Sequence, residues 1–190
     1  MCGGSCSTAA SRGSRAENRQ LASTLGQWRG ESAGDALVFN ELKWRQKSLK
    51  FAKSPIHAWG LYAVEPIAEE DFVVEYIGEY VRAQVAEVRQ RNYERFGFGD
   101  DYIFRVDTEG CVDATKKGGL ARFANHCCEP NCYTRIVKVG GKPRIALYSK
   151  RSIEAGEEIT YDYKFDREED GSAARIPCQC GARRCSGFLN

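Results

Sequence analysis

Apolar residues occur in short runs separated by turn residues from about Leu49 onward, a pattern that favours many small strands over long helices. Five of these runs are predicted to be strands, at 72–78, 102–106, 111–114, 133–139 and 144–149. The last two flank Gly140-Gly141, a strong signal for a β-hairpin. The second and third are expected to pair around Glu109-Gly110. The pattern therefore predicts a largely β domain.

One segment has the pattern of a sizeable helix. Between Arg82 and Phe96, apolar residues such as Val85 and Val88 stand among charged ones, with neither Gly nor Pro. Gly97 follows directly and is expected to end the helix. The predicted fold class is accordingly mainly β with a few short helices.

Composition divides the chain into four parts. Residues 1–35 are rich in Ser, Gly, Ala and Arg with few large apolar groups, so we expect a flexible tail. Residues 36–49 form a basic and apolar flanking segment, and 50–170 the compact domain. A polar, acidic stretch at 166–174 leads into the final part, 171–190, which holds three cysteines.

The charge and the hydrophobic content limit the kinds of partner. The formal net charge of +2 lacks the excess of a large basic face, so no direct nucleic-acid specificity is expected. No apolar run approaches the roughly 20 residues of a membrane span, and a secretory signal pattern is not visible at the start. We therefore expect an intracellular protein that does not bind membranes.

Nine cysteines require an explanation, and an odd number would leave one outside any set of disulfides. Clustered thiols in a reducing compartment bind zinc more often than one another. Cys178, Cys180 and Cys185 offer three ligands, and tetrahedral zinc needs a fourth, for which the group at 127–132 is the obvious source. Spacing alone does not decide which cysteine of that group donates. The alternative is a set of free, inert thiols.

Several tyrosines recur on the predicted strands. Tyr161 and Tyr163 are two residues apart, so on one strand both would face the same way. Tyr76, Tyr102 and Phe104 lie on other predicted strands. Each taken singly is more typical of a core aromatic residue, but together they would suit a lysine, whose alkyl stem packs on rings and whose ammonium is drawn to their faces.

Asn125 and His126 precede the first cysteine group in a predicted turn. They would either cap a short helix or hold a polar cofactor. Residues alone leave both readings open.

Five motifs in order resemble those of the SET-domain protein lysine methyltransferases, over about Lys50 to Asn190. They are RFANHCCEPN (122–131), EEITYDY (157–163), the terminal Cys-x-Cys-x4-Cys, and the weaker HAWGLYA (57–63) and EYIGE (75–79). The spacing is most similar to the MLL/COMPASS branch, which methylates the lysine at position four of histone H3. The resemblance implies a SET β-clip with a pseudoknot, in which RFANHC and TYDY cross, followed by a zinc-bound post-SET segment.

The resemblance also implies the ligands. The cofactor would be S-adenosylmethionine, held by His57, Ala58, Trp59, Tyr102, Asn125, His126 and Gln179. One structural zinc ion would be bound by Cys128, Cys178, Cys180 and Cys185.

Roles for the aromatic residues follow from the same resemblance. Tyr163 matches the catalytic tyrosine of the family, and Tyr102 would share contacts with cofactor and lysine. Tyr161 occupies the Phe/Tyr switch position, which implies that the isolated domain mainly monomethylates. Tyr76 and Phe104 would line the lysine channel.

The implied partners are the histone H3 tail, a WD40 adaptor and other COMPASS-type core subunits, in nuclear chromatin. Arg15, within Ser14-Arg15-Ala16-Glu17, resembles the arginine motif by which this branch docks into the adaptor. A solvated tail is the alternative reading of those four residues.

Two other functions fit the sequence less well than a methyltransferase does. A SET fold that grips a histone tail or partner without turnover is disfavoured by the intact Tyr161-Asp162-Tyr163 and Asn125-His126. A zinc-structured nucleic-acid binder is disfavoured by the near-neutral charge, and it leaves the tyrosines unexplained.

Overall fold

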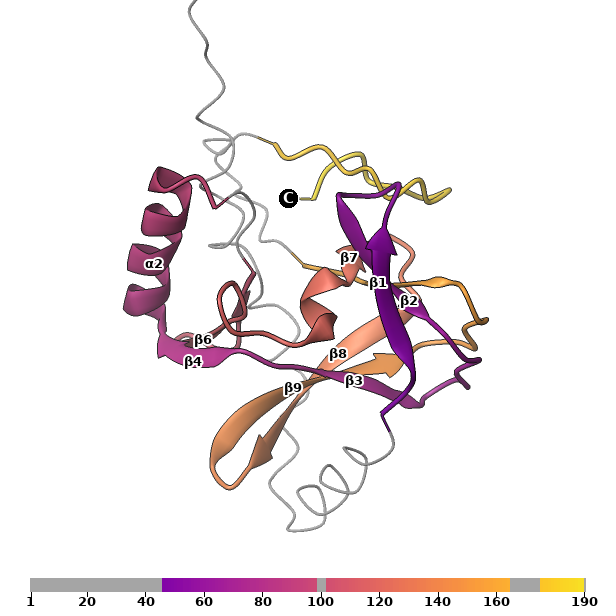
Figure 1. The fold of residues 1–190 in the computed structure, drawn as a ribbon, viewed down its shortest axis with the longest axis horizontal. Coiled ribbons are helices and arrows are strands. Elements are labelled where there is room, and N and C mark those ends of the chain that lie inside the picture. The colour runs from indigo at the N-terminus through magenta and orange to yellow at the C-terminus, as the bar shows by residue number, and fades with distance from the viewer. Residues whose placement is uncertain (1–45, 99–101, 165–174, 190) are drawn as a thin grey trace, which may run out of the picture.

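The computed structural model describes residues 46–98, 102–164 and 175–189, which form two β-sheets, one long helix and a short 3-10 helix (Figure 1). The elements in chain order are β1 (Leu49–Lys53), β2 (Trp59–Ala63), β3 (Phe72–Tyr76), β4 (Glu79–Arg82), α2 (Ala83–Arg95), β5 (Ile103–Arg105), β6 (Gly110–Asp113), η1 (Leu120–Phe123), β7 (Asn125–His126), β8 (Cys132–Val139), β9 (Lys142–Ser149) and β10 (Glu158–Tyr161). None of the helices in this part of the chain has the length and apolar character that crossing a bilayer requires.

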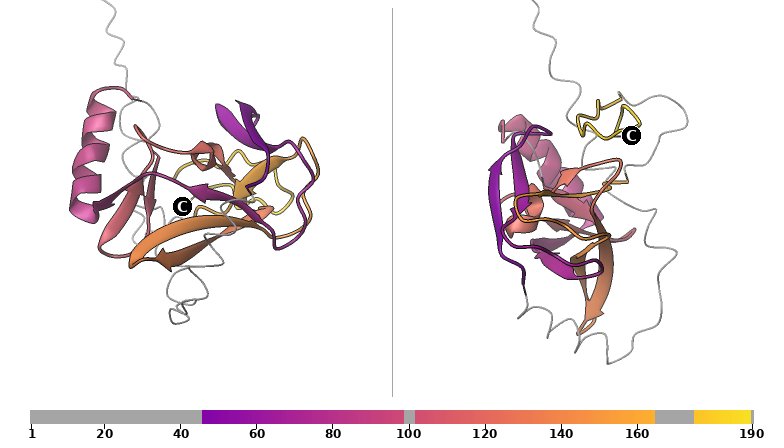
Figure 2. Two further views of the ribbon diagram at one scale, coloured as in Figure 1. Left: turned by 60° about the horizontal axis from the view of Figure 1, so that its bottom comes forward. Right: turned by 90° about the vertical axis from the view of Figure 1, so that its right-hand side faces the viewer.

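The larger sheet joins segments that are distant in sequence. Its strand order is β1-β2-β10-β8-β9-β3, and β7 pairs with β10 as a side branch. The smaller sheet has the order β4-β6-β5. Helix α2 lies with the smaller sheet at one end of the molecule, and β1 and β2 lie at the other (Figures 1 and 2).

Strand β10 is held between two parts of one motif. It runs parallel to β7, with Thr160 opposite Asn125 and Tyr161 opposite His126, and parallel to the start of β8, where Tyr161 is opposite Cys132. The chain therefore runs beside β10 as β7, loops away through 127–131 and returns to β10 as β8. This is the crossing expected between the RFANHC and TYDY segments, and it explains why Asn125 and His126 form a strand rather than the predicted turn.

Asn131 fastens this crossing. Its side chain is 2% exposed, its Nδ2 donates to the Glu158 carbonyl at 2.7 Å and to Glu157 Oε1 at 3.0 Å, and its Oδ1 accepts the Thr160 N–H at 2.8 Å. A buried amide with all these partners is stabilising, whereas losing one partner leaves buried groups unpaired. The loop before β8 is thus tied to the strand that precedes the tyrosines.

Two elements that depend on local sequence, a helix and a hairpin, are confirmed. Helix α2 differs from the prediction by one residue at each end, and Gly97 after it has φ +69°. The hairpin of β8 and β9 is confirmed, with φ of +58° at Gly140 and +74° at Gly141, as a two-residue hairpin turn requires.

The strand predicted at 72–78 is shorter than expected, and the chain enters the second sheet directly after it. Strand β3 ends at Tyr76, and β4, which was not predicted, begins at Glu79 in the smaller sheet. Between them Gly78 passes so close to β6 that a Cβ there would lie 2.7 Å from the Asp113 carbonyl oxygen. The glycine permits the chain to change sheets at this point.

Helix α2 is fixed to the smaller sheet by polar contacts as well as by Ala86 and Tyr93. The carboxylate of Asp113, which is 1% exposed, accepts hydrogen bonds from Arg89 Nη1 and Tyr93 Oη, each at 2.8 Å. Burial alone would raise the pKa of Asp113, but the bonds from Arg89, Thr115 and Tyr93 outweigh it and lower that pKa. Burial and the nearby carboxylate raise the pKa of Tyr93 to about 12, so its hydroxyl stays a donor.

We predict that Asp113→Asn lowers the free energy of unfolding by about 2 kcal/mol at pH 7, because the charged acceptor of two buried bonds is lost. Since the folded pKa is depressed, the wild-type contribution is present above about pH 4 and disappears as the pH falls through the folded pKa. The gap between variant and wild type in urea unfolding should therefore narrow at acid pH. The exposed Glu87→Gln on α2 serves as the control, and equal stability of the Asp113 variant and wild type at pH 7 would contradict the prediction.

Candidate functional site

Two tyrosines meet where β10 ends. Tyr161 is the last residue of β10 and is 2% exposed, and its ring centroid lies 4.8 Å from that of Tyr163. The expectation that both lie on one strand is wrong, because Tyr163 follows the strand. It is held instead by its own hydroxyl, which donates to the Ala124 carbonyl at 2.9 Å. The two rings are therefore neighbours by tertiary contact rather than by strand periodicity.

The other predicted aromatic residues lie around this pair. Phe104 stacks on Tyr161 with ring centroids 6.3 Å apart, and Tyr76 packs on Phe104 at 5.4 Å. Both are buried, and the Tyr76 hydroxyl donates to the Tyr102 carbonyl at 3.1 Å. Tyr102 itself is half-buried beside Phe123. The structure thus connects Tyr76, Phe104 and Tyr161 in one aromatic wall, with Tyr102 at its edge.

His126 links the tyrosines to the cysteines. Its Nδ1 accepts the Tyr163 backbone N–H at 3.1 Å, and its Nε2 lies 3.4 Å from Cys128 Sγ. Because Nδ1 accepts a hydrogen bond, the neutral ring carries its proton on Nε2 and donates it to the sulfur. One imidazole therefore spans the distance between a candidate metal ligand and the backbone of the candidate catalytic tyrosine.

Four thiols converge beyond His126. The sulfur atoms of Cys128, Cys178, Cys180 and Cys185 all lie within 4.8 Å of one another, and all four thiols are free. Cys128 comes from the loop after β7 and the others from the C-terminal segment, which closes on itself through a Cys178 N–H to Gly187 carbonyl bond at 2.9 Å. Within 127–132, Cys128 is therefore the residue that meets the terminal group.

The surroundings favour the thiolate at two of these residues, Cys180 and Cys128, whereas burial raises the pKa of Cys178. Burial opposes ionisation, yet backbone N–H groups of Cys128 and Ala182 and neighbouring thiols lower the pKa of Cys180 to about 6. Burial likewise opposes it at Cys128, whose pKa is nevertheless lowered by hydrogen bonds from Ser186 and His126. Four converging sulfur donors with no carboxylate among them match the ligand set of a structural zinc ion.

The structure brings some of the predicted cofactor residues together, and it does not join Gln179 to them by any described hydrogen bond. Asn125 is 7% exposed and donates from Nδ2 to the Trp59 carbonyl at 3.0 Å, so it joins the loop that contains His57 and Ala58. These two loop residues are exposed, and Trp59 is 39% exposed. Gln179 is exposed on the C-terminal segment, and among the described hydrogen bonds none connects it to Asn125.

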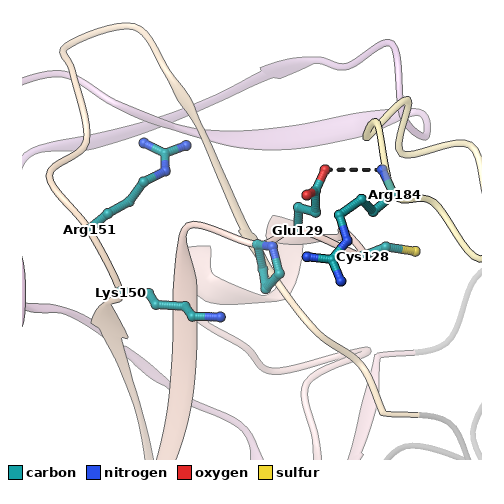
Figure 3. Close-up of a pocket in the computed structure, with 6 residues that line it drawn as sticks. Cys128, Glu129, Lys150, Arg151 and Arg184 are labelled. Atoms are coloured by element: carbon teal, nitrogen blue, oxygen red, sulfur yellow. Dashed lines mark hydrogen bonds between the residues drawn. The ribbon is translucent and has the colours of Figure 1, made fainter.

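A hollow of about 480 Å³ is lined by one member of the cysteine cluster, Cys128 (Figure 3). Its lining is mostly charged and comprises Cys128, Glu129, Pro130, Lys150, Arg151 and Arg184. The Arg184 backbone N–H donates to Glu129 Oε2 at 3.2 Å, which gives the C-terminal segment a second attachment to the body of the domain (Figure 3). None of the predicted tyrosines lines this hollow, so it is separate from the aromatic wall.

Two important residues were not singled out from the sequence. Asn131 and Glu158 both lie inside the motifs quoted above. Their polar character is the one signal in the sequence that could have pointed to them, and other residues of the same motifs share it. Their roles depend on contacts between segments, which a pattern along one segment does not contain. Arg15 lies outside the described residues.

Comparison with known proteins identifies the family. Residues 58–164 match the family model of the SET domain. The chain belongs to the SET-domain family, and the expected fold class, mainly β with short helices, is confirmed.

The similar curated proteins share one description, "Histone-lysine N-methyltransferase, H3 lysine-4 specific". The protein of Debaryomyces hansenii is 53% identical over 183 residues, that of Chaetomium globosum 52% over 183 residues and that of Saccharomyces cerevisiae 50% over 182 residues. Each alignment covers 95% of this chain and 17% of the relative. The chain thus spans about a sixth of the length of these relatives, and its resemblance to the branch specific for H3 lysine 4 is confirmed.

We predict one zinc ion per chain, because a terminal segment of this size with few apolar contacts needs a metal to hold it in place. Elemental analysis should find the ion in purified protein, and Cys185→Ser should lose most of it. Removal with a chelator should speed tryptic cleavage after Arg183 and Arg184.

Cys6→Ser, in the N-terminal part of the chain, is the matched control and should keep its metal. Folded wild-type protein that contains no metal and still resists trypsin at these two arginines would contradict the prediction.

Proposed function

We propose that this chain is the catalytic domain of a histone-lysine N-methyltransferase that uses S-adenosylmethionine and modifies the lysine at position four of histone H3. One observation carries the proposal. The rings of Tyr161 and Tyr163 pack on each other, and that of Tyr163 contacts His126 of β7, in a chain about half identical to enzymes of that name.

The residues of the loop and β7 fit the proposed cofactor. Trp59 is 39% exposed, and its backbone carbonyl accepts a hydrogen bond from the buried amide of Asn125. A partly exposed aromatic residue joined to a polar amide suits a ligand with both a flat base and a charged amino acid part. His57, Ala58, Tyr102, His126 and Gln179 would complete the site. When bound, S-adenosylmethionine supplies a methyl group on a positively charged sulfonium.

The substrate lysine must lose a proton before it can accept a methyl group. Its pKa of about 10.4 makes deprotonation at pH 7 cost about 4 to 5 kcal/mol. An aromatic wall that excludes water disfavours the ammonium and so lowers the lysine pKa, which lets the proton leave to water. In this proposal Tyr76, Phe104 and Tyr161 supply that wall.

Tyr163 would align the amine for attack. Its hydroxyl proton is engaged by the Ala124 carbonyl, so the hydroxyl oxygen acts as an acceptor toward an N–H of the lysine. That bond fixes the direction of the nitrogen lone pair, and the His126 contact fixes the tyrosine backbone. The catalytic contribution is alignment and charge stabilisation rather than covalent chemistry.

The proposal extends to the setting of the enzyme. The histone H3 tail is the substrate, nuclear chromatin is the location, and a WD40 adaptor with other COMPASS-type core subunits stimulates activity. The names of the relatives support the histone substrate, and the resemblance of the sequence to the MLL/COMPASS branch supports the partners.

The decisive experiment incubates the chain with labelled S-adenosylmethionine and a histone H3 tail peptide, then maps the modified residue by mass spectrometry. We expect methylation at position four, and Tyr163→Phe should reduce turnover by about a hundredfold or more while cofactor affinity stays within about twofold of wild type.

Tyr80→Phe is the matched control, because Tyr80 is exposed on β4 and no described hydrogen bond or ring contact joins it to the predicted site residues. Binding of the peptide without turnover would favour a histone-binding module instead. Undiminished turnover in the Tyr163 variant would remove that residue from the mechanism.

The number of methyl groups added to the target lysine is predicted to depend on the Tyr161 hydroxyl. In the proposed site this hydroxyl holds a water beside the target nitrogen and so limits the room for further methyl groups. The wild-type domain alone should mainly monomethylate, and Tyr161→Phe should produce dimethylated and trimethylated peptide, as read by mass spectrometry. An unchanged product distribution would refute the role given to Tyr161.

A further inference from the structure

Glu158 is a partly buried carboxylate surrounded by neutral donors. It accepts Asn125 Nδ2 at 2.7 Å, Ser54 Oγ at 2.9 Å and Tyr62 Oη at 3.2 Å. These donors come from β7, from the loop after β1 and from β2. The carboxylate of β10 is therefore the point where the segments around the cofactor loop meet.

No cation offsets this charge within the described part of the chain, where no Lys or Arg forms an ion pair with Glu158. Its neighbour Glu157, by contrast, is paired with Arg151. Burial, followed by the charge of Glu158, raises the pKa of Tyr62, which keeps that phenol protonated and donating. A partly buried carboxylate that is held by directed hydrogen bonds from three neutral groups is suited to orienting its donors.

The backbone beside Glu158 is adapted to its approach. A Cβ at Gly60 would overlap Glu158 Oε1 and would lie 2.8 Å from the carboxyl carbon. The glycine in the HAWGLYA segment thus permits the carboxylate to reach Asn125. Two of the sequence motifs are joined at this contact.

The contact determines which way the Asn125 amide points. Its Nδ2 faces the Glu158 carboxylate, the Trp59 carbonyl and, at 3.3 Å, Ser54 Oγ. A flipped amide would place its oxygen against a carboxylate and a carbonyl, which are both acceptors only. The amide oxygen is therefore held on the opposite side, and no described residue donates a hydrogen bond to it.

We propose that Glu158 is a positioning residue that holds the Asn125 oxygen outward as an acceptor for a cationic amine. The amine would be the α-ammonium of S-adenosylmethionine, so this inference rests on the proposed function for the identity of the cofactor. An ammonium has only donors, and a fixed acceptor oxygen selects it over ligands that lack it. Glu158 thereby makes the site selective for the amino acid part of the cofactor.

Calorimetric titration of the full chain with two ligands tests this. S-adenosylmethionine carries the amine, whereas methylthioadenosine has the same nucleoside and lacks the amino acid part. Glu158→Gln keeps the volume of the side chain but removes one of the two acceptor-only groups that fix the orientation of the Asn125 amide. We expect about tenfold weaker binding of S-adenosylmethionine, because one directed bond to a charged group is lost, and methylthioadenosine affinity within about twofold of wild type.

The exposed Glu154→Gln is the matched control and should bind both ligands like the wild type. Equal weakening of both ligands by Glu158→Gln would reduce Glu158 to a structural role, and no weakening of either would also overturn the proposal. In an Asn125→Ala background, Glu158→Gln should have no further effect on either ligand. A wild-type chain that binds neither ligand would count against the proposed function itself.

If Glu158→Gln lowers the thermal midpoint so far that the variant is unfolded, Ser54→Ala decides the question. That change removes one donor of the cluster and keeps the carboxylate. A loss of twofold or more confined to S-adenosylmethionine would support the proposal, and a loss shared by both ligands or absent from both would overturn it.

Discussion

The parallel pairing of β10 with β7 and β8 is the interaction on which the rest of the molecule depends. It places Tyr161 beside His126 and Cys132, and it sets the direction in which the chain continues to Tyr163. Asn131, with two bonds to β10 and one to Glu157 just before it, keeps the intervening loop attached to this strand. The aromatic wall, the cysteine cluster and the cofactor loop are all attached to this short crossing, so its few hydrogen bonds support three different parts of the site.

The candidate catalytic tyrosine and the cysteine cluster are connected as well as adjacent. His126 contacts the backbone of Tyr163 through one nitrogen and the sulfur of Cys128 through the other. Glu158, two residues before Thr160 on β10, accepts hydrogen bonds from Asn125 and from Ser54 in the loop before β2. The two residues of β7 thus point in opposite directions, His126 toward the thiols and Asn125 toward the proposed cofactor. A strand of two residues can do this because successive side chains on a strand point to opposite faces.

Features that depend on local sequence could be predicted, and those that depend on contact between distant segments could not. Helix α2 and the hairpin at Gly140-Gly141 are local, and both were found. The strand order was beyond sequence patterns, because β2 pairs with β10 across about a hundred residues. Likewise the spacing of the cysteines indicated a metal centre but left Cys128 undecided until the fold brought it to the terminal group. Glu158 was missed since its importance lies in donors from three other segments.

The central position of β10 also has a kinetic consequence. It is the last strand of the described chain, yet it joins β2 on one side to β7 and β8 on the other. Until residues 158–161 leave the ribosome, the hairpin of β8 and β9 and the pair of β1 and β2 have no shared strand between them. Contacts of such large sequence separation are slow to form. Assembly of the larger sheet therefore has to wait for β10, and a nascent chain that stops short of β10 exposes two unpaired edges.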